Sequence, residues 1–179
     1  MLVAQQKRKE NIAEYILYLY QVEDLIRAFQ LDMNLINEKL VASYRVDEKT
    51  SKDISAWYEN LVLIMKKEGR QKTGHLQFLD NLVGDLYEFH LRLLAGMADS
   101  EYTSGFNSVS GLVTELRQKN PHADNDVQAA IDGIYGYLLL KIQGKEITGE
   151  TVDAVKRLSS WMSQLSKHYR DFESGDLQL

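Results

Sequence analysis

Apolar residues recur at alternating spacings of three and four along almost the whole chain, and this spacing constrains the fold most strongly. It places apolar side chains on one face of an α-helix and does not match the two-residue period of a β-strand. Short polar segments separate seven such stretches. We therefore expect seven helices, at about 4–30, 33–44, 48–68, 74–97, 99 or 100 to 120, 125–144 and 148–173.

A shortage of turn residues supports the same fold class. The chain has one proline in 179 residues, far below ordinary usage, and its one Asp-Gly pair, Asp132-Gly133, lies within a helical pattern. A β-rich fold needs more turns than this. The sequence predicts an all-α, single-domain antiparallel helical bundle of about seven helices, with a buried N-terminal helix. We expect one domain over 1–179, with 1–4 and 174–179 frayed.

Several polar residues stand where helix ends are expected. Side chains of Asp, Asn and Thr accept hydrogen bonds from the first free amides of a helix. Gly69 follows a basic last turn and is suited to a left-handed stop. The predicted N-terminal caps are Asp32, Asp47, Thr73, Asp124 or Asn125, and Thr148.

Three tyrosines within six residues are the most unusual feature of the first helix. This helix is apolar on nearly all sides in its middle, so it should be buried by several neighbours. Tyr15, Tyr18 and Tyr20 combine large apolar rings with hydroxyl groups that seek partners when buried. They could line a pocket, anchor an interface, or simply reach from the core to the surface.

Composition excludes several classes of function. The chain has no cysteine, which excludes disulfides, thiol catalysis and cysteine-ligated metals. Its formal charge of −5 disfavours binding to nucleic acid or to an anionic membrane. The most apolar stretch, Ile12 to Val22, is too short to span a membrane, and no secretory signal is recognised. We expect a cytoplasmic protein.

The four histidines lack the spacing of known metal motifs. Neither Glu-x-x-His nor His-x-x-x-His occurs, so no metal site and no cofactor is predicted. His90 is the strongest candidate for a ligand-binding residue because it lies beside the apolar seam of its helix. His168 has a similar position, His75 falls in the first turn of a helix, and His122 follows the proline.

Other chemical motifs are absent or have ordinary explanations. Glu23 and Arg27, like Glu88 and Arg92, have the spacing of ion pairs on a solvated helix face. The glycines in Gly133-Ile134-Tyr135-Gly136 lie within a helix, where they suit close approach of a neighbouring helix more than a ligand. No phosphate-binding glycine loop or nucleophile elbow is present, which argues against an enzyme but leaves that class open.

Four stretches carry a resemblance to a known family. They are Gln5 to Phe29, which includes Gln-Lys-Arg-Lys-Glu-Asn-Ile at 6–12, and residues 74–78, 86–90 and 169–173. Together they resemble an all-helical family from Bacteroidetes catalogued as a domain of unknown function. The resemblance covers nearly the whole chain. It implies a bacterial cytoplasmic protein with a helical fold, and it implies no activity, cofactor or catalytic residue.

Three function classes therefore remain open. The first is a non-catalytic binding or scaffolding module that acts through a homodimer or a protein partner. The second is a small-ligand receptor or enzyme with a pocket between helices, near His90 and the group Tyr15, Tyr18 and Tyr20. A nucleic-acid-binding regulator is the weakest of the three, because no helix has a long basic face.

Overall fold

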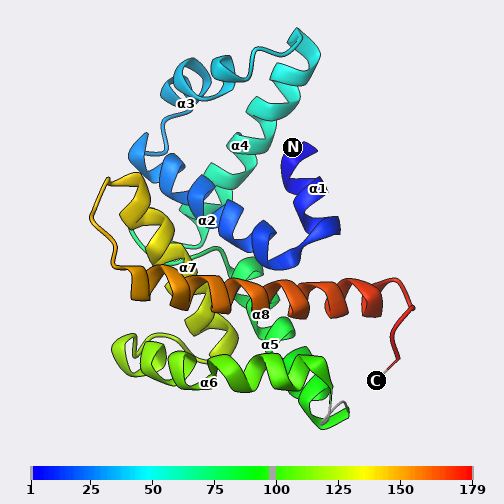
Figure 1. The fold of residues 1–179 in the computed structure, drawn as a ribbon. Coiled ribbons are helices and arrows are strands. Elements are labelled where there is room, and N and C mark those ends of the chain that lie inside the picture. The colour runs from blue at the N-terminus through cyan, green and yellow to red at the C-terminus, as the bar shows by residue number, and fades with distance from the viewer. Residues whose placement is uncertain (1, 97–99, 179) are drawn as a thin grey trace.

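The computed structural model describes residues 2–96 and 100–178, which form eight α-helices and one 3₁₀ helix and contain no strand (Figure 1). This confirms the all-α class. The elements are α1 (Leu2–Glu10), α2 (Ile12–Ala28), α3 (Met33–Lys39), η1 (Val41–Tyr44), α4 (Glu48–Lys67), α5 (Gln77–Gly96), α6 (Glu101–Lys119), α7 (Asp126–Ile142) and α8 (Gly149–Glu173).

The predicted first helix, 4–30, is in fact two helices. Asn11 has extended backbone angles, and its side chain accepts a hydrogen bond from the amide of Glu14, so it caps α2 and separates it from α1. The second predicted helix is also divided, since α3 ends at Lys39 and a 3₁₀ turn follows. The predicted helices were therefore too long in both places. Fraying at either end of the chain stays a prediction, although Leu2 already lies in α1.

Most predicted caps are confirmed. The side chains of Asp32, Asp47, Asn125 and Thr148 each accept a backbone hydrogen bond at the start of a helix. Ser100 caps α6, whereas the alternative start at Asp99 and the predicted end of the preceding helix at Met97 lie outside the described residues. Gly69 has a φ of 72°, as a left-handed stop requires.

The cap predicted at Thr73 is wrong, because α5 begins at Gln77. The amides at this helix start are bonded by carboxylates from elsewhere in the chain. Glu23 accepts from the amide of Leu76 and Glu68 from the amide of Gln77, each over 2.8 Å. The sequence around a helix start does not indicate such caps, because the capping side chains come from other parts of the chain.

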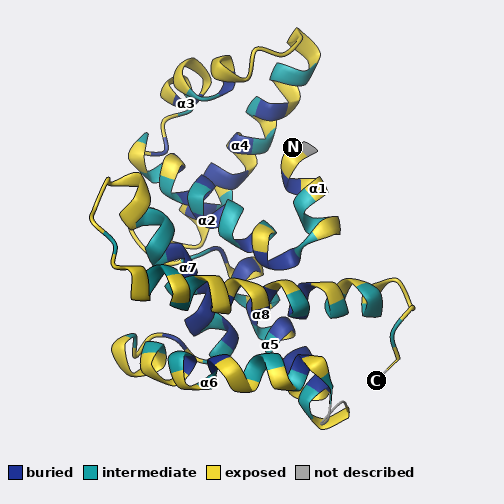
Figure 2. Ribbon diagram, viewed as in Figure 1, coloured by how far each residue is buried: buried dark blue, intermediate teal, exposed yellow. Residues whose placement is uncertain are grey.

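The core lies where α2, α5, α7 and α8 meet (Figure 2). The long helix α8 crosses the middle of the molecule and contacts α1, α2, α5, α6 and α7. As predicted, the apolar middle of the N-terminal region is buried on several sides, because α2 packs against α1, α4, α7 and α8. In the described residues, no helix is long and apolar enough to cross a membrane.

Of the two glycines in Gly133-Ile134-Tyr135-Gly136, one permits close packing, as predicted. A Cβ at Gly133 would lie 2.9 Å from Cδ1 of Leu116, so α6 approaches α7 closely there. A Cβ at Gly136 would meet no atom within 4 Å. The close approach therefore accounts for Gly133 and not for Gly136.

Replacing Thr148 with alanine is expected to destabilise the protein by about 1 kcal/mol, because the amide of Thr151 loses its side-chain acceptor. Urea unfolding followed by circular dichroism measures the change. Thr114→Ala, at an exposed position within α6, is the matched control, and its stability should change by less than about 0.5 kcal/mol. Equal losses in the two variants would contradict the capping role.

Candidate functional site

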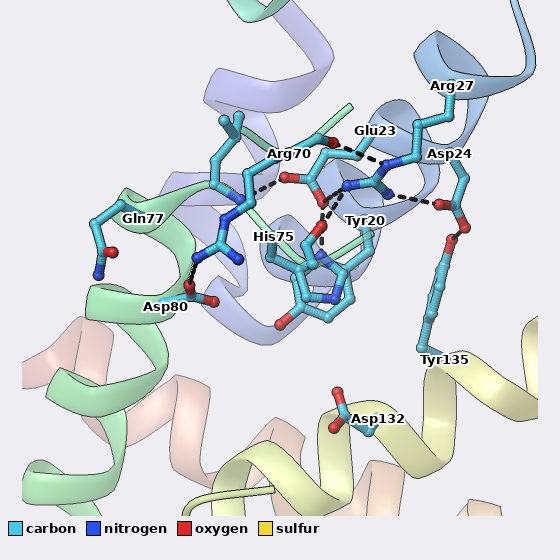
Figure 3. A network of polar contacts seen from close by, with 12 residues as sticks. Tyr20, Glu23, Asp24, Arg27, Arg70, His75, Gln77, Asp80, Asp132 and Tyr135 are labelled. Atoms are coloured by element: carbon cyan, nitrogen blue, oxygen red, sulfur yellow. Dashed lines mark hydrogen bonds and ion pairs between the residues drawn. The ribbon is translucent and has the colours of Figure 1, made fainter. Parts of the chain in front are cut away.

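The connection between α4 and α5, residues 68–76, lies against α2 and forms one wall of the candidate site (Figure 3). Gly69 and Gly74 both have positive φ angles, of 72° and 79°, which glycine adopts without strain. The connection therefore turns sharply twice before α5 begins. This geometry brings His75 over the surface of α2.

Glu23 on α2 fixes this connection from below. Glu23 is only 1% exposed. Its Oε2 lies 2.6 Å from Nδ1 of His75, and its Oε1 accepts a hydrogen bond from the backbone amide of Leu76 at 2.8 Å. The sequence interpretation of Glu23 as a solvated surface residue is wrong. A signal was available, since Glu23 lies four residues after Leu19 and three before Ile26, both buried on the seam of α2.

Arg27 also binds the connection instead of forming a simple surface pair. Its guanidinium donates to the carbonyl oxygens of Arg70 and Gly74 and to Oδ1 of Asp24, the last over 2.8 Å. Its nearest approach to Glu23 is 4.0 Å. Glu23 and Arg27, the predicted i,i+4 pair, therefore both hold the α4–α5 connection in place. Arg27 binds its backbone carbonyl oxygens, and Glu23 binds the amide of Leu76.

The ring of His75 is held in one orientation. It stacks on the ring of Tyr20 with centroids 3.4 Å apart and an interplanar angle of 10°. With the carboxylate oxygen of Glu23 as the acceptor, the Nδ1–H of His75 is the donor of this hydrogen bond. Nε2 has no hydrogen-bond partner among residues 2–96 and 100–178. In the neutral ring this nitrogen is an acceptor.

A polar cleft of about 870 Å³ opens beside His75. Arg70, His75, Asp80 and Gly84 line one side, and the opposite side comes from the loop before α7 and the first turns of α7. The lining residues on that side are His122, Asp124, Asn125, Gln128 and Asp132. The cleft therefore joins segments that are about 50 residues apart in the chain.

The two inner carboxylates of the cleft are in different environments. Asp132 accepts from the amide groups of Gln128 and Asn120, at 2.6 and 2.9 Å, and burial raises its pKa. Asp80 accepts from Nη2 of Arg70 at 3.4 Å, and burial raises its pKa as well. Within the described part of the chain, Asp132 has no ion pair.

Of the four residues selected from the sequence, Tyr20 lies at this site. Its hydroxyl accepts from Nε2 of Gln128 at 3.3 Å, and the same nitrogen donates to Asp132. Tyr20 therefore connects the stacked His75 ring with the α7 side of the cleft. His75, Glu23 and Asp132 were not selected, because their contacts come from three separate elements.

Tyr15 and Tyr18 point to other parts of the molecule. Tyr15 is half-buried and lies near Arg8, which pairs with Glu173 at the end of α8 over 2.7 Å. Tyr18 lies beside Tyr44, and burial raises the pKa of Tyr18. The three tyrosines thus have different neighbours, and ligand binding at Tyr15, Tyr18 or Tyr20 stays a prediction.

His90 is buried in an aromatic cluster formed with side chains of α6 and α8. It is fully buried, its Nδ1 lies 2.5 Å from the hydroxyl of Tyr102, and the rings of Phe106 and Trp161 contact it edge-on. Trp161 donates to the same hydroxyl at 3.2 Å. The structure therefore surrounds His90 with aromatic side chains, with a hydroxyl as its hydrogen-bond partner, and does not bring it together with the tyrosines of α2.

The burial of His90 predicts a pH-dependent stability. Burial lowers its pKa from 6.5 to about 4, so between these pH values the unfolded state binds more protons than the folded state. We expect full stability above pH 6.5 and a loss of about 2–3 kcal/mol as the pH falls to 4. Urea unfolding at several pH values, compared with His90→Gln, measures this contribution. Identical pH profiles would contradict it.

In the part of the chain that the structure describes, no group of three or more His, Asp or Glu side chains has the arrangement of a metal site. The cleft instead combines a fixed histidine, carboxylates, amides and a guanidinium. Such a set can bind a small polar molecule through several hydrogen bonds.

These features define an all-α protein with a polar cleft between its helices. The chain belongs to the family described as Domain of unknown function (DUF4924), whose family model matches residues 1–176. This confirms the resemblance to a domain of unknown function. No curated protein and no solved structure matches the chain.

Proposed function

We propose that this protein is a small-ligand-binding protein whose ligand occupies the cleft beside His75. The observation that carries the proposal is the fixed His75 ring. Glu23 and Tyr20 hold it in place, and its Nε2 has no partner within the described residues. A polar atom held ready beside a cavity of about 870 Å³ is suited to a ligand hydrogen bond.

The surroundings of His75 support the same function. Glu23 and Arg27 anchor the loop that carries it, so little conformational freedom is lost when a ligand binds. On the other side, one amide nitrogen of Gln128 bonds both Tyr20 and Asp132. Hydrogen bonds within the protein thus fix the polar side chains on both walls of the cleft before a ligand binds.

Gly84 offers a direct test. It lies on α5 in the wall of the cleft, and a Cβ there would meet no atom within 4 Å, so Gly84→Leu adds bulk to the cleft without a clash at Cβ. The matched control is Gly111→Leu on α6, also helical and open at Cβ. Both changes remove a helical glycine, and both variants should fold at least as stably as the parent protein.

The measurement is native mass spectrometry of the protein purified without chelators, followed by denaturation to release and weigh any bound molecule. We expect a small-molecule adduct on the parent protein and on Gly111→Leu, and its loss from Gly84→Leu. Amide chemical shifts then locate added polar metabolites on the structure. An adduct retained in Gly84→Leu, or shifts confined to other surfaces, would contradict binding in the cleft.

A second candidate function is protein–protein contact, either in a homodimer or with another protein. A groove of about 380 Å³ between α1 and the start of α4 favours it, because three exposed apolar residues lie there. These are Val3, Tyr44 and Val46, at 42, 36 and 42% exposed. Exposed apolar side chains that gather in one groove are typical of interaction surfaces. A cytoplasmic location, consistent with a chain that has no cysteine, is part of this proposal.

Native mass spectra over a range of protein concentrations test the homodimer. We expect a dimer mass that Val46→Glu removes and that Ile142→Glu, at an exposed apolar position on α7, leaves unchanged. A monomer at every concentration would contradict self-association through this groove.

A further inference from the structure

We infer that the ligand of the cleft carries an ammonium group, which Asp132 and His75 bind from opposite walls. This inference rests on the proposed function and specifies its ligand. Figure 3 shows the carboxylate of Asp132 directed from α7 toward the stacked rings of His75 and Tyr20.

In the described residues no arginine or lysine pairs with Asp132, and His75, whose charge acts on this carboxylate, is cationic only when its ring is protonated. Both donors to this carboxylate are neutral amides, from Gln128 and Asn120. A half-buried carboxylate without a cation pays a desolvation cost that amide donors offset incompletely. Burial accordingly raises the pKa of Asp132. A ligand cation would supply the missing charge.

The other charged groups around the cavity also favour a positively charged ligand. The lining holds three carboxylates, on Asp80, Asp124 and Asp132, and one guanidinium, on Arg70. Nη2 of Arg70 pairs with Asp80 at 3.4 Å, while its buried Nε has no hydrogen-bond partner in the described residues. An anionic ligand would therefore meet an excess of negative charge, whereas a cation is attracted to it.

The free nitrogen of His75 adds chemical specificity. With Nδ1 donating to Glu23, Nε2 of the neutral ring accepts a hydrogen bond. An ammonium group has three N–H donors and no acceptor, so it can donate to His75 and to Asp132 at the same time. A metal ion is a poorer fit, since in the described residues no three His, Asp or Glu side chains are arranged so that they could hold one together.

Three probes with the same carbon skeleton test the inference: n-butylammonium, n-butanol and n-butyrate. Titrations followed by ¹H–¹⁵N NMR at neutral pH report where and how tightly each one binds. We expect n-butylammonium to shift amides of the loop 68–76 and of the first turns of α5 and α7. Butyrate should leave them unchanged. The dissociation constant of butylammonium should rise about tenfold in Asp132→Asn, and it should also rise with ionic strength.

Two variants separate charge from folding. Asp85→Asn removes a carboxylate from the exposed face of α5, and it should leave butylammonium binding unchanged. Asp80→Asn lowers the negative charge of the cleft at a second position, so it replaces Asp132→Asn if that variant does not fold. An affinity that neither Asp80→Asn nor Asp132→Asn reduces would overturn the role of these carboxylates.

The outcomes distinguish the ligand class from the function. If butyrate or butanol shifts the cleft amides and butylammonium does not, the cation is overturned while binding in the cleft stands. If none of the three probes shifts the cleft and the purified protein carries no adduct there, both proposals fail. Shifts that Gly84→Leu abolishes, with the expected preference for butylammonium, support both.

Discussion

Replacing Glu23 with alanine is expected to lower the free energy of unfolding by about 3–5 kcal/mol. The change leaves His75 Nδ1 and the amide of Leu76 without their acceptor, and it removes the buried charge near Arg27. Because Glu23 is almost fully buried, water does not easily replace these contacts. Urea unfolding followed by circular dichroism gives the change in free energy.

Glu59→Ala, at an exposed position on α4, is the control for Glu23→Ala and should change stability by less than about 0.5 kcal/mol. Glu23→Gln separates charge from hydrogen bonding, since an amide oxygen can still accept from Leu76. Its loss should be smaller than that of the alanine variant. A loss below about 1 kcal/mol for Glu23→Ala would contradict the anchoring role of this carboxylate.

Replacing Trp161 with alanine should cost about 3–5 kcal/mol, because the change opens a large cavity in the core. The side chain is 1% exposed and packs against His90 and Phe106, with ring centroids 5.3 and 5.1 Å away. The hydroxyl of Tyr102 also loses the hydrogen bond from the indole nitrogen. Thermal and urea unfolding measure the loss.

The matched control is the other tryptophan of the chain, Trp57, which is half-buried on α4. Trp57→Ala should destabilise the protein less, since part of its ring is already in contact with water. If Trp57→Ala costs as much as Trp161→Ala, the aromatic cluster around His90 is not the more tightly packed part of the core.

The cleft is built from charged groups that the surrounding fold holds in place. Glu23 supplies both a partner for His75 and a cap for α5, so the same carboxylate stabilises the fold and positions the candidate binding group. The Glu23 variants are therefore suited to stability measurements. Gly84→Leu and Asp132→Asn are the better tests of binding, because they alter the cavity and leave the loop anchors in place.

The sequence by itself determined the helical elements of this protein. Helix periodicity and capping depend on residues within about four positions of each other, so the seams and caps such as Asp47 and Thr148 could be read directly. The break at Asn11 was missed although its cap is local, because residues 5–11 are all polar and contain no proline or glycine that would mark a helix end.

Only the tertiary structure decided the candidate site. Glu23 and His75 are 52 positions apart, and Tyr20 and Gln128 are 108 apart. The place of Glu23 on the seam of α2 indicates burial, but which groups its carboxylate contacts depends on where the α4–α5 connection folds, and no local pattern encodes those contacts. Tyr20 could be selected because tyrosine is informative by its type alone. Glu23, His75 and Asp132 are ordinary surface residue types, and they become notable only when the fold buries them together.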